Sequence, residues 1–251
     1  MLKKIAFVTA LAAATSFATW DKFPVLDNHQ GNAEVGAGYE TAGDGSSLGL
    51  FVQGRFTVLP GLELATQVPF TVFTHDDGDD TGEDGLNNVP LMVRYQFIPV
   101  MNAFVDVEFP VGDESVSDDG FAFHFGVQYS QEFGPVNFGS ELGFAMHTEG
   151  DDKSADPNDL NLGVEAQFAL GMVTPYVGVD LDMWIGEYTY DGKDVAGSDA
   201  SGKVGVAPYV GAAVEINEMF YADVSASIGL GEDYYGEDAP ISVEAKFGVN
   251  F

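Results

Sequence analysis

Polar and apolar residues alternate with a period of two along most of the chain. In its last segment, Ile241, Val243 and Ala245 share one face, while Ser242 and Glu244 share the other. Because successive side chains of a β-strand point to opposite sides, this pattern predicts strands with one apolar and one polar face. No helical period follows residue 18, so we expect an all-β fold.

The alternation divides the chain into about twelve strands, each near the ~9–11 residues that cross a bilayer when tilted. Strands of this length and number favour a transmembrane up-and-down antiparallel β-barrel. A secreted β-sandwich also alternates polar and apolar residues, but its strands are shorter. The predicted strands span residues 33–39, 47–59, 62–73, 88–98, 101–111, 120–133, 136–147, 159–170, 173–189, 203–216, 219–230 and 240–251.

The connections between these strands alternate between tight turns, such as Pro60-Gly61 and Gly134-Pro135, and long acidic segments. In an up-and-down barrel every second connection lies at the same end. All the tight turns are therefore expected at one end and all the long loops at the other, which is the outer-membrane pattern of short periplasmic turns and long external loops. The long loops are predicted at residues 40–46, 74–85, 112–119, 148–157, 190–202 and 231–238.

The N-terminus is typical of a secretory signal peptide. Lys3 and Lys4 precede an apolar run at residues 5–14, which is too short to span a bilayer, and small residues near Ala18 suit cleavage. The role of the next segment stays open: it caps the periplasmic mouth, hangs free or contacts a partner. The predicted organisation is a signal peptide at 1–18, a periplasmic N-terminal segment at 19–32 and an outer-membrane β-barrel at 33–251.

Charge and composition exclude several classes of function. The 40 Asp and Glu residues against 9 Lys and Arg residues give a net charge of −31, which excludes nucleic acid as a partner. With no cysteine, a disulfide scaffold, thiol catalysis and a thiolate zinc site are also excluded. More than half of the acidic residues fall in the six long loops, so the external rim should repel anions and concentrate cations.

The most acidic loop contains carboxylates that suit a hard cation. Asp76, Asp77, Asp79 and Asp80 follow one another closely, but Asn88 stands where an EF-hand loop needs its bidentate Glu. We therefore expect calcium or magnesium to bind loosely at these four residues, and we expect no other cofactor.

The inward faces of the strands carry both signs of charge, and this leaves two alternatives. Opposed basic and acidic walls would create a transverse field that orients dipolar solutes. Alternatively, neighbours such as Arg55, Glu63 and Arg94 pair with one another and fill a closed interior. The residues predicted to line the lumen and set its selectivity are Arg55, Glu63, Arg94, Asp106, Glu108, Asp180, Asp182, Glu244 and Lys246.

An enzymatic function is not expected. His124 and His147 point inward on the predicted strands, whereas Ser140 is the one serine predicted in mid-strand on the lipid face. A hydrolase acting on lipid needs its serine and its base on the same face.

Several stretches resemble a known family. Residues 54–64 with 68–70, 85–91 with 95–97, and 107–113 are similar to the barrel transporters labelled as the MetA pathway of phenol degradation, although Asn87-Asn88 stands where that family usually has Gly-Asp. The chain also ends in Phe251 after an alternating strand, as outer-membrane barrels typically do, which implies recognition by the barrel-assembly machinery. The resemblance implies a transport-like barrel.

The function predicted from the sequence is that of a monomeric channel or transporter for small solutes in the outer membrane of a Gram-negative-type bacterium. Its lumen would select by size and charge, and its partners would be membrane lipid and small solutes. The alternative is a non-conducting structural or adhesive barrel that acts through its acidic loops.

Overall fold

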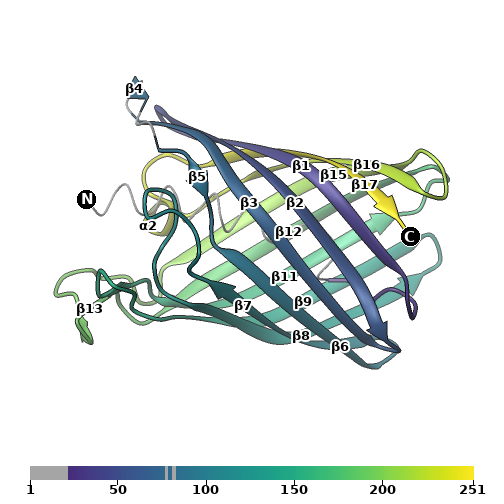
Figure 1. Ribbon diagram of the computed structural model, residues 1–251, viewed down its shortest axis with the longest axis horizontal. Coiled ribbons are helices and arrows are strands. Elements are labelled where there is room, and N and C mark those ends of the chain that lie inside the picture. The colour runs from purple at the N-terminus through teal and green to yellow at the C-terminus, as the bar shows by residue number, and fades with distance from the viewer. Residues whose placement is uncertain (1–21, 77–78, 81–82) are drawn as a thin grey trace.

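The computed structural model describes residues 22–76, 79–80 and 83–251. Within them, twelve antiparallel strands form a closed barrel (Figure 1). The first strand, β1 (Gly31–Ala42), pairs with both β2 (Gly45–Leu59) and the last strand, β17 (Ile241–Asn250), and these pairings close the sheet. The remaining wall strands are β3 (Leu62–Asp76), β6 (Val89–Ile98), β7 (Met101–Phe109), β8 (Ala122–Phe133), β9 (Val136–His147), β11 (Asn158–Phe168), β12 (Val173–Ile185), β15 (Val204–Glu215) and β16 (Phe220–Ile228).

All tight turns but one, together with the C-terminus, lie at one end of the barrel, here called the turn end (Figure 1). The long connections lie at the opposite, long-loop end, where β1 also turns tightly into β2. None of the helices in the described part of the chain is long and apolar enough to cross a membrane. The connections carry the short elements β4 (Asp79–Asp80), β5 (Gly85–Leu86), β10 (Ser154–Ala155), β13 (Thr189–Tyr190), β14 (Lys193–Asp194) and α2 (Glu232–Tyr235).

The predicted fold class is confirmed, but several predicted boundaries differ from the observed ones by a few residues, and two of them have a clear physical reason. No long loop occupies residues 40–46, because β1 and β2 stay paired as far as Ala42 and Gly45 and turn at Gly43 with φ 56°. The polar residues at 40–46 do not end the two strands, because the backbone pairing of β1 with β2 continues through them. Conversely, β12 stops at Ile185 instead of residue 189, since Gly186 takes φ 115°, a backbone conformation that suits glycine.

The barrel is polar inside and apolar outside. Val52 and Val210 on the outer face are 56% and 57% exposed, whereas Glu63 and Arg94 on the inner face are 0% and 2% exposed. A water-soluble protein has the reverse distribution. An apolar band facing outward around a polar interior is the pattern of a transmembrane barrel, so the outer face meets lipid.

The predicted signal peptide, residues 1–18, lies outside the described residues, as do residues 19–21.

Candidate functional site: the barrel interior and its external mouth

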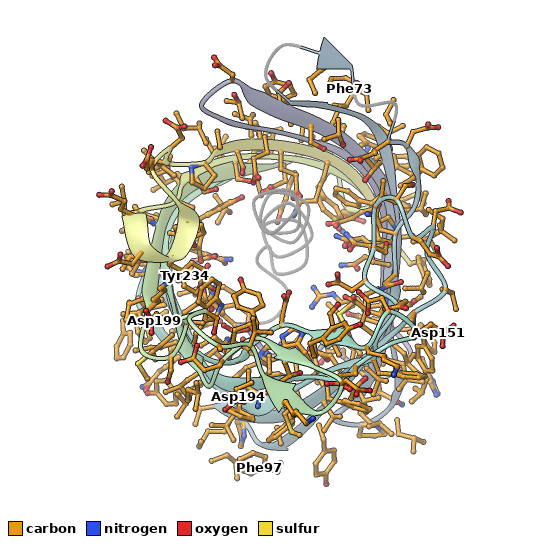
Figure 2. The ribbon with its side chains drawn as sticks, turned by 90° about the vertical axis from the view of Figure 1, so that its left-hand side faces the viewer. Phe73, Phe97, Asp151, Asp194, Asp199 and Tyr234 are labelled. Atoms are coloured by element: carbon orange, nitrogen blue, oxygen red, sulfur yellow. The ribbon has the colours of Figure 1, made fainter. Side chains whose placement is uncertain are left out.

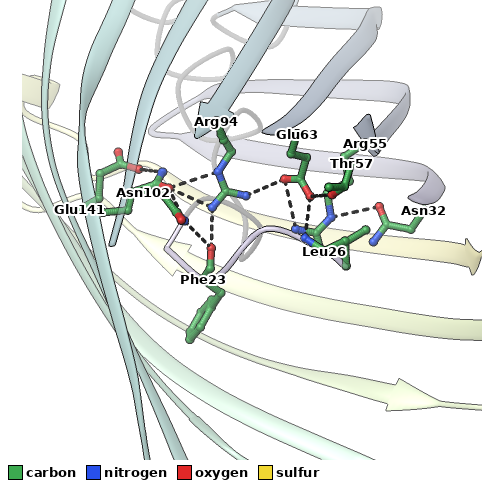
Figure 3. Close-up of polar contacts among 10 residues, drawn as sticks. Phe23, Leu26, Asn32, Arg55, Thr57, Glu63, Arg94, Asn102 and Glu141 are labelled. Atoms are coloured by element: carbon green, nitrogen blue, oxygen red, sulfur yellow. Dashed lines mark hydrogen bonds and ion pairs between the residues drawn. The ribbon is translucent and has the colours of Figure 1, made fainter. Parts of the chain in front are cut away.

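Glu63 on β3 is the centre of an ion network near the turn end (Figure 3). Its Oε1 atom lies 3.0 Å from Arg94 Nη1 and 3.7 Å from Arg55 Nη1. Its Oε2 atom accepts hydrogen bonds from the backbone N–H of Leu26 at 3.0 Å and from Thr57 Oγ1 at 3.5 Å. A buried carboxylate needs such cations and donors in place of water. This side chain is therefore held rigidly and its charge is balanced locally.

The strand register explains why these side chains meet. Glu63 lies directly opposite Arg94 across the β3–β6 pair, where side chains on one face are close enough to interact. Arg94 also donates to Gln128 Oε1 from Nε at 3.2 Å and from Nη2 at 2.9 Å. Gln128 in turn donates to Glu141 at 2.7 Å. The network thus connects β3, β6, β8 and β9 across the inner wall.

Residues 22–30, called here the inner segment, lie within the barrel. The backbone carbonyl of Phe23 accepts hydrogen bonds from Arg94 Nη2 at 2.6 Å and Asn102 Nδ2 at 3.0 Å. Closer to β1, the N–H of His29 donates to the carbonyl of Thr57 at 2.9 Å. The segment therefore follows the inner wall toward the turn end, where it continues into β1.

The wall has room for the inner segment because two of its inward residues are glycines. A Cβ atom at Gly139 would lie 2.5 Å from the backbone oxygen of Lys22, and one at Gly163 would lie 2.3 Å from the Cε of Lys22. The lysine reaches across β11, so that its Nζ is 2.7 Å from Asp180 Oδ1 on β12 and donates to the Tyr209 hydroxyl on β15 at 3.2 Å. The inner segment is thus fixed by both backbone and side-chain contacts.

A second ion cluster lies on β16 and β17. Lys246 Nζ is 3.3 Å from Glu244 Oε1 and 3.8 Å from Asp223 Oδ1, and the Tyr176 hydroxyl donates to Asp223 at 2.9 Å. All four side chains project from the inner face. Here too the basic residue is paired with acids on its own strand and the adjacent strand.

These contacts bear on the two arrangements considered from the sequence. Arg55, Arg94 and Lys246 are each engaged by carboxylates in the part of the chain that the structure describes, as the pairing alternative predicts. That the pairs fill and close the interior stays a prediction. All nine predicted lumen residues lie on inward-facing positions of the wall strands. Their role in selection is not tested by this placement and stays a prediction.

Toward the long-loop end the interior contains two histidines among carboxylates. His124 Nε2 is 2.9 Å from Asn161 Oδ1, and His124 Nδ1 is 3.4 Å from Asp106. His147 Nε2 is 3.4 Å from Asp159. Both rings thus contact carboxylates, and His124 also packs edge-on against Phe104, with ring centroids 4.7 Å apart.

The connection from β7 to β8 packs against the wall, and the sequence analysis did not foresee this. The Asn87 side-chain amide donates to the carbonyl of Val116 at 3.0 Å, and the Asn88 amide donates to that of Asp118 at 2.7 Å. Val116 is only 2% exposed. The Asn87-Asn88 pair, noted above as a departure from the family and EF-hand patterns, thus holds this loop in place.

The predicted cation-binding loop falls largely outside what the structure describes. Asp77 is outside the described residues, and the side chains of Asp76, Asp79 and Asp80 are outside them too, although the β3–β4 backbone pairing is described. Among the described side chains there is no group of three or more metal-ligating residues that would hold an ion. Loose binding of calcium or magnesium at these four residues remains a prediction.

Comparison with known proteins finds barrels of similar structure. No family model matches the chain, and no curated protein matches it. The COG4313 outer membrane channel from Pseudomonas putida F1 superimposes with a TM-score of 0.76 at 12% identity, covering 94% of this chain and 100% of that one. The NanC porin gives a TM-score of 0.56 at 13% identity, covering 87% of this chain and 98% of that one. The monoaromatic hydrocarbon channel CymD gives a TM-score of 0.51 at 8% identity, covering 90% of this chain and 88% of that one. At these identities the likeness establishes the fold, which is the closed β-barrel of Gram-negative outer-membrane channels.

Proposed function

We propose that the protein is an outer-membrane channel for small solutes and that its acidic interior favours cations. The observation that carries the proposal is the inner surface itself: a closed wall lined with ionised side chains, inside an apolar outer face. Such a lining stabilises hydrated or polar solutes, whereas an interior packed with aliphatic side chains would not. The shared fold with outer-membrane channels supports this function.

The charges are distributed along the barrel axis in a way that favours this selectivity. Four basic residues of the described interior lie in the middle and the turn-end half of the barrel and are paired with acids: Arg55, Arg94, Lys22 and Lys246. Lys203 lies at the mouth, over Trp184. The long-loop half contributes Asp106, Glu108, Asp118, Asp159 and Asp182. A solute approaching from the long-loop end meets negative charge first, which raises the local concentration of cations.

The test is single-channel recording of the refolded mature protein in a planar bilayer, with reversal potentials measured in a salt gradient. Stable current steps with a preference for cations would support the proposal. The proposal fails if the barrel resists denaturant, shows heat-dependent gel mobility and never conducts, even after removal of the inner segment.

A second candidate function has one observation in its favour. Because the inner segment occupies part of the lumen, a non-conducting barrel that acts through its acidic loops as a structural or adhesive protein also fits. Under that alternative, Arg94→Ala changes only the stability of the barrel, and deletion of external loops abolishes surface interactions. Under the channel proposal, Arg94→Ala changes conductance or ion selectivity as well.

The remaining features of the proposal come from the sequence and the closure of the barrel. β17 pairs with β1 within one chain, and Phe251 follows it with 64% exposure, which suits a monomer whose last strand is presented to the barrel-assembly machinery. The kinship with the MetA-pathway transporters stays a prediction, and the channel proposal does not depend on it.

A further inference from the structure

Four aromatic side chains gather at the external mouth and form what we call the mouth cluster: Trp184, Tyr188, Tyr234 and Tyr235. The Trp184 ring centroid is 4.5 Å from that of Tyr234 and 5.7 Å from that of Tyr188, and the two adjacent tyrosines are 4.8 Å apart. Trp184 ends the inward series of β12, whereas Tyr234 comes from α2, at one side of the mouth (Figure 2). The pairing of β12 with β15, over which Tyr234 packs, brings these distant parts of the chain together.

The surrounding backbone fixes the positions of the rings. A Cβ atom at Gly205 would lie 2.6 Å from the Tyr234 ring, so this ring packs directly on β15. On the other side, Glu187 accepts hydrogen bonds from the N–H groups of Ala200 at 2.7 Å and Ser201 at 3.3 Å, and from the Ser198 hydroxyl. These contacts hold the loop that follows Trp184. Aromatic surfaces fixed in this way bind a ligand with little loss of conformational entropy.

Carboxylates face the rings from the inner wall. The Tyr234 hydroxyl donates to Asp159 Oδ1 at 3.4 Å. Asp182 lies two residues before Trp184 on the same inward series, and no hydrogen-bond or ion-pair partner reaches its carboxylate from the described residues. Burial, together with the charges of Asp159 and Asp182, raises the pKa of the Tyr234 hydroxyl well above its ordinary value. The Tyr234 ring is therefore neutral, and the side chains that face it from the inner wall are carboxylates.

A cation already lies over one of these rings. Lys203 Nζ is 5.8 Å from the centroid of Trp184, within the distance at which an ammonium group is attracted to the face of an aromatic ring. The lysine shows that this face of Trp184 is presented to positive charge. Neutral sugars also stack on aromatic rings, but the acidic surroundings and the position of Lys203 favour a positively charged ligand.

We propose that the mouth cluster binds small organic cations of the alkylammonium class, with the ammonium group against Trp184 and Tyr234 and its charge balanced by Asp159 and Asp182. The use of this site as the first binding position of a transported solute rests on the proposed channel function. The binding itself does not require an open pore, so the two proposals can fail separately.

The experiment is a binding titration of the folded barrel in a nonionic polyoxyethylene detergent. The chain has 2 tryptophans, so a Trp20→Phe background leaves Trp184 as the only tryptophan to report fluorescence. The probe is choline, and its uncharged isostere 3,3-dimethylbutan-1-ol is the matched control, with sodium chloride added to equal ionic strength. We expect a saturable fluorescence change with choline alone. An identical curve for the alcohol, or no saturation with choline, overturns the proposal.

Variants of the aromatic residues distinguish choline binding at the mouth cluster from nonspecific binding to the barrel. Tyr234→Leu should weaken choline binding about tenfold, as expected for loss of a desolvated cation–π contact. Tyr234→Phe keeps the ring and should stay within about twofold of the parent. Tyr190→Leu is the matched control, because Tyr190 is 57% exposed on β13 and is not part of the mouth cluster. If Tyr234→Leu and Tyr190→Leu bind choline equally well, the mouth cluster is not the site.

Charge variants test the other half of the proposal. Asp182→Asn should weaken binding about fivefold, whereas Asp194→Asn, the same change on exposed β14, should not. Lys203→Met removes the competing cation and should tighten binding about threefold, while Lys193→Met on β14 should leave it unchanged. Heat-dependent gel mobility confirms that each variant is folded. A Lys203→Met variant that binds no better than its control contradicts the assignment of the Trp184 face.

The outcomes also distinguish this proposal from the channel proposal. A barrel that binds choline at the mouth cluster and never conducts refutes the channel and leaves the binding site standing. A barrel that conducts cations but gives no saturable binding refutes the binding site alone.

Discussion

The two halves of the barrel interior contain the same types of charged residue, but these residues have different roles in each half. Near the turn end, Glu63 is completely buried between Arg55 and Arg94, and its charge is used up in holding the wall together. At the long-loop end, Asp182 faces aromatic rings with no ion-pair partner among the described residues, and Asp159 contacts only a histidine and a phenol at the edge of hydrogen-bonding distance. The comparison shows that charge in a barrel acts on a solute only where the wall has not already neutralised it.

The largest effect is expected from removing the inner segment. Deletion of residues 22–30 should raise single-channel conductance severalfold, because a stretch of chain that lies along the inner wall is gone. Lys22→Met is the matched control, since it breaks the contact with Asp180 but leaves the segment in place. Equal conductance of the deletion and the full-length protein would show that the segment does not limit flow.

The paired half should respond to charge removal through stability. Glu63→Gln leaves two arginines near a neutral side chain, and breaking a buried ion pair in this way costs about 3–5 kcal/mol of unfolding free energy. Urea unfolding of the refolded barrel measures the loss. Glu132→Gln makes the same change at an exposed residue of β8 and should have little effect. Similar unfolding curves for the two variants would mean that the Glu63 network carries no net stability.

The mouth should respond through selectivity instead. At pH 8.5, where the carboxyl is ionised, Asp182→Asn should lower the cation-to-anion permeability ratio about twofold, because it removes a charge from the path of the solute. Reversal potentials in a salt gradient report the ratio. Asp194→Asn changes the net charge equally but on exposed β14. If both variants shift the reversal potential to the same degree, the total charge of the protein and not the mouth sets selectivity.

The smallest effect concerns a single acid in the loop between β10 and β11. Burial, followed by the charge of Asp118, raises the pKa of Asp156 to about 6. Protonation therefore favours the folded state, and the wild type loses stability as pH rises through about 6.

Asp156→Asn should raise the unfolding temperature at pH 8 by about 2 °C, with no gain at pH 4. Thermal unfolding at both pH values is the measurement, and the control is Asp151→Asn, which changes an exposed residue of the same connection between β9 and β11. A gain that does not depend on pH would point to a cause other than titration.

The wall was largely predictable from the sequence, because a strand with one polar and one apolar face shows the alternation of residue types within its own short stretch of chain. The strand at residues 136–147 was placed at its observed bounds for this reason. The neighbours Arg55, Glu63 and Arg94 were also recognised as a group that could pair, since consecutive hairpins put them side by side. Local period and hairpin order together contain this information.

What the sequence did not reveal depends on contacts that have no local signature. The carbonyl of Phe23 binds Arg94 across 71 positions of the chain, and a backbone acceptor looks the same in every residue. Trp184 and Tyr234 meet only because β12 pairs with β15 and α2 folds back over β15. Asn87 and Asn88 read as ordinary loop residues until the loop they hold is folded against them.

The two glycines beneath Lys22 make the evolution of the wall depend on that of the inner segment. A side chain at Gly139 or Gly163 would occupy the space that Lys22 now fills. A lineage that loses the segment escapes this restriction, and larger residues then become acceptable at both positions. Among relatives of this barrel, the presence of the segment and the size of residues 139 and 163 should therefore change together. Small residues at both positions would then indicate a barrel with a segment of chain inside it.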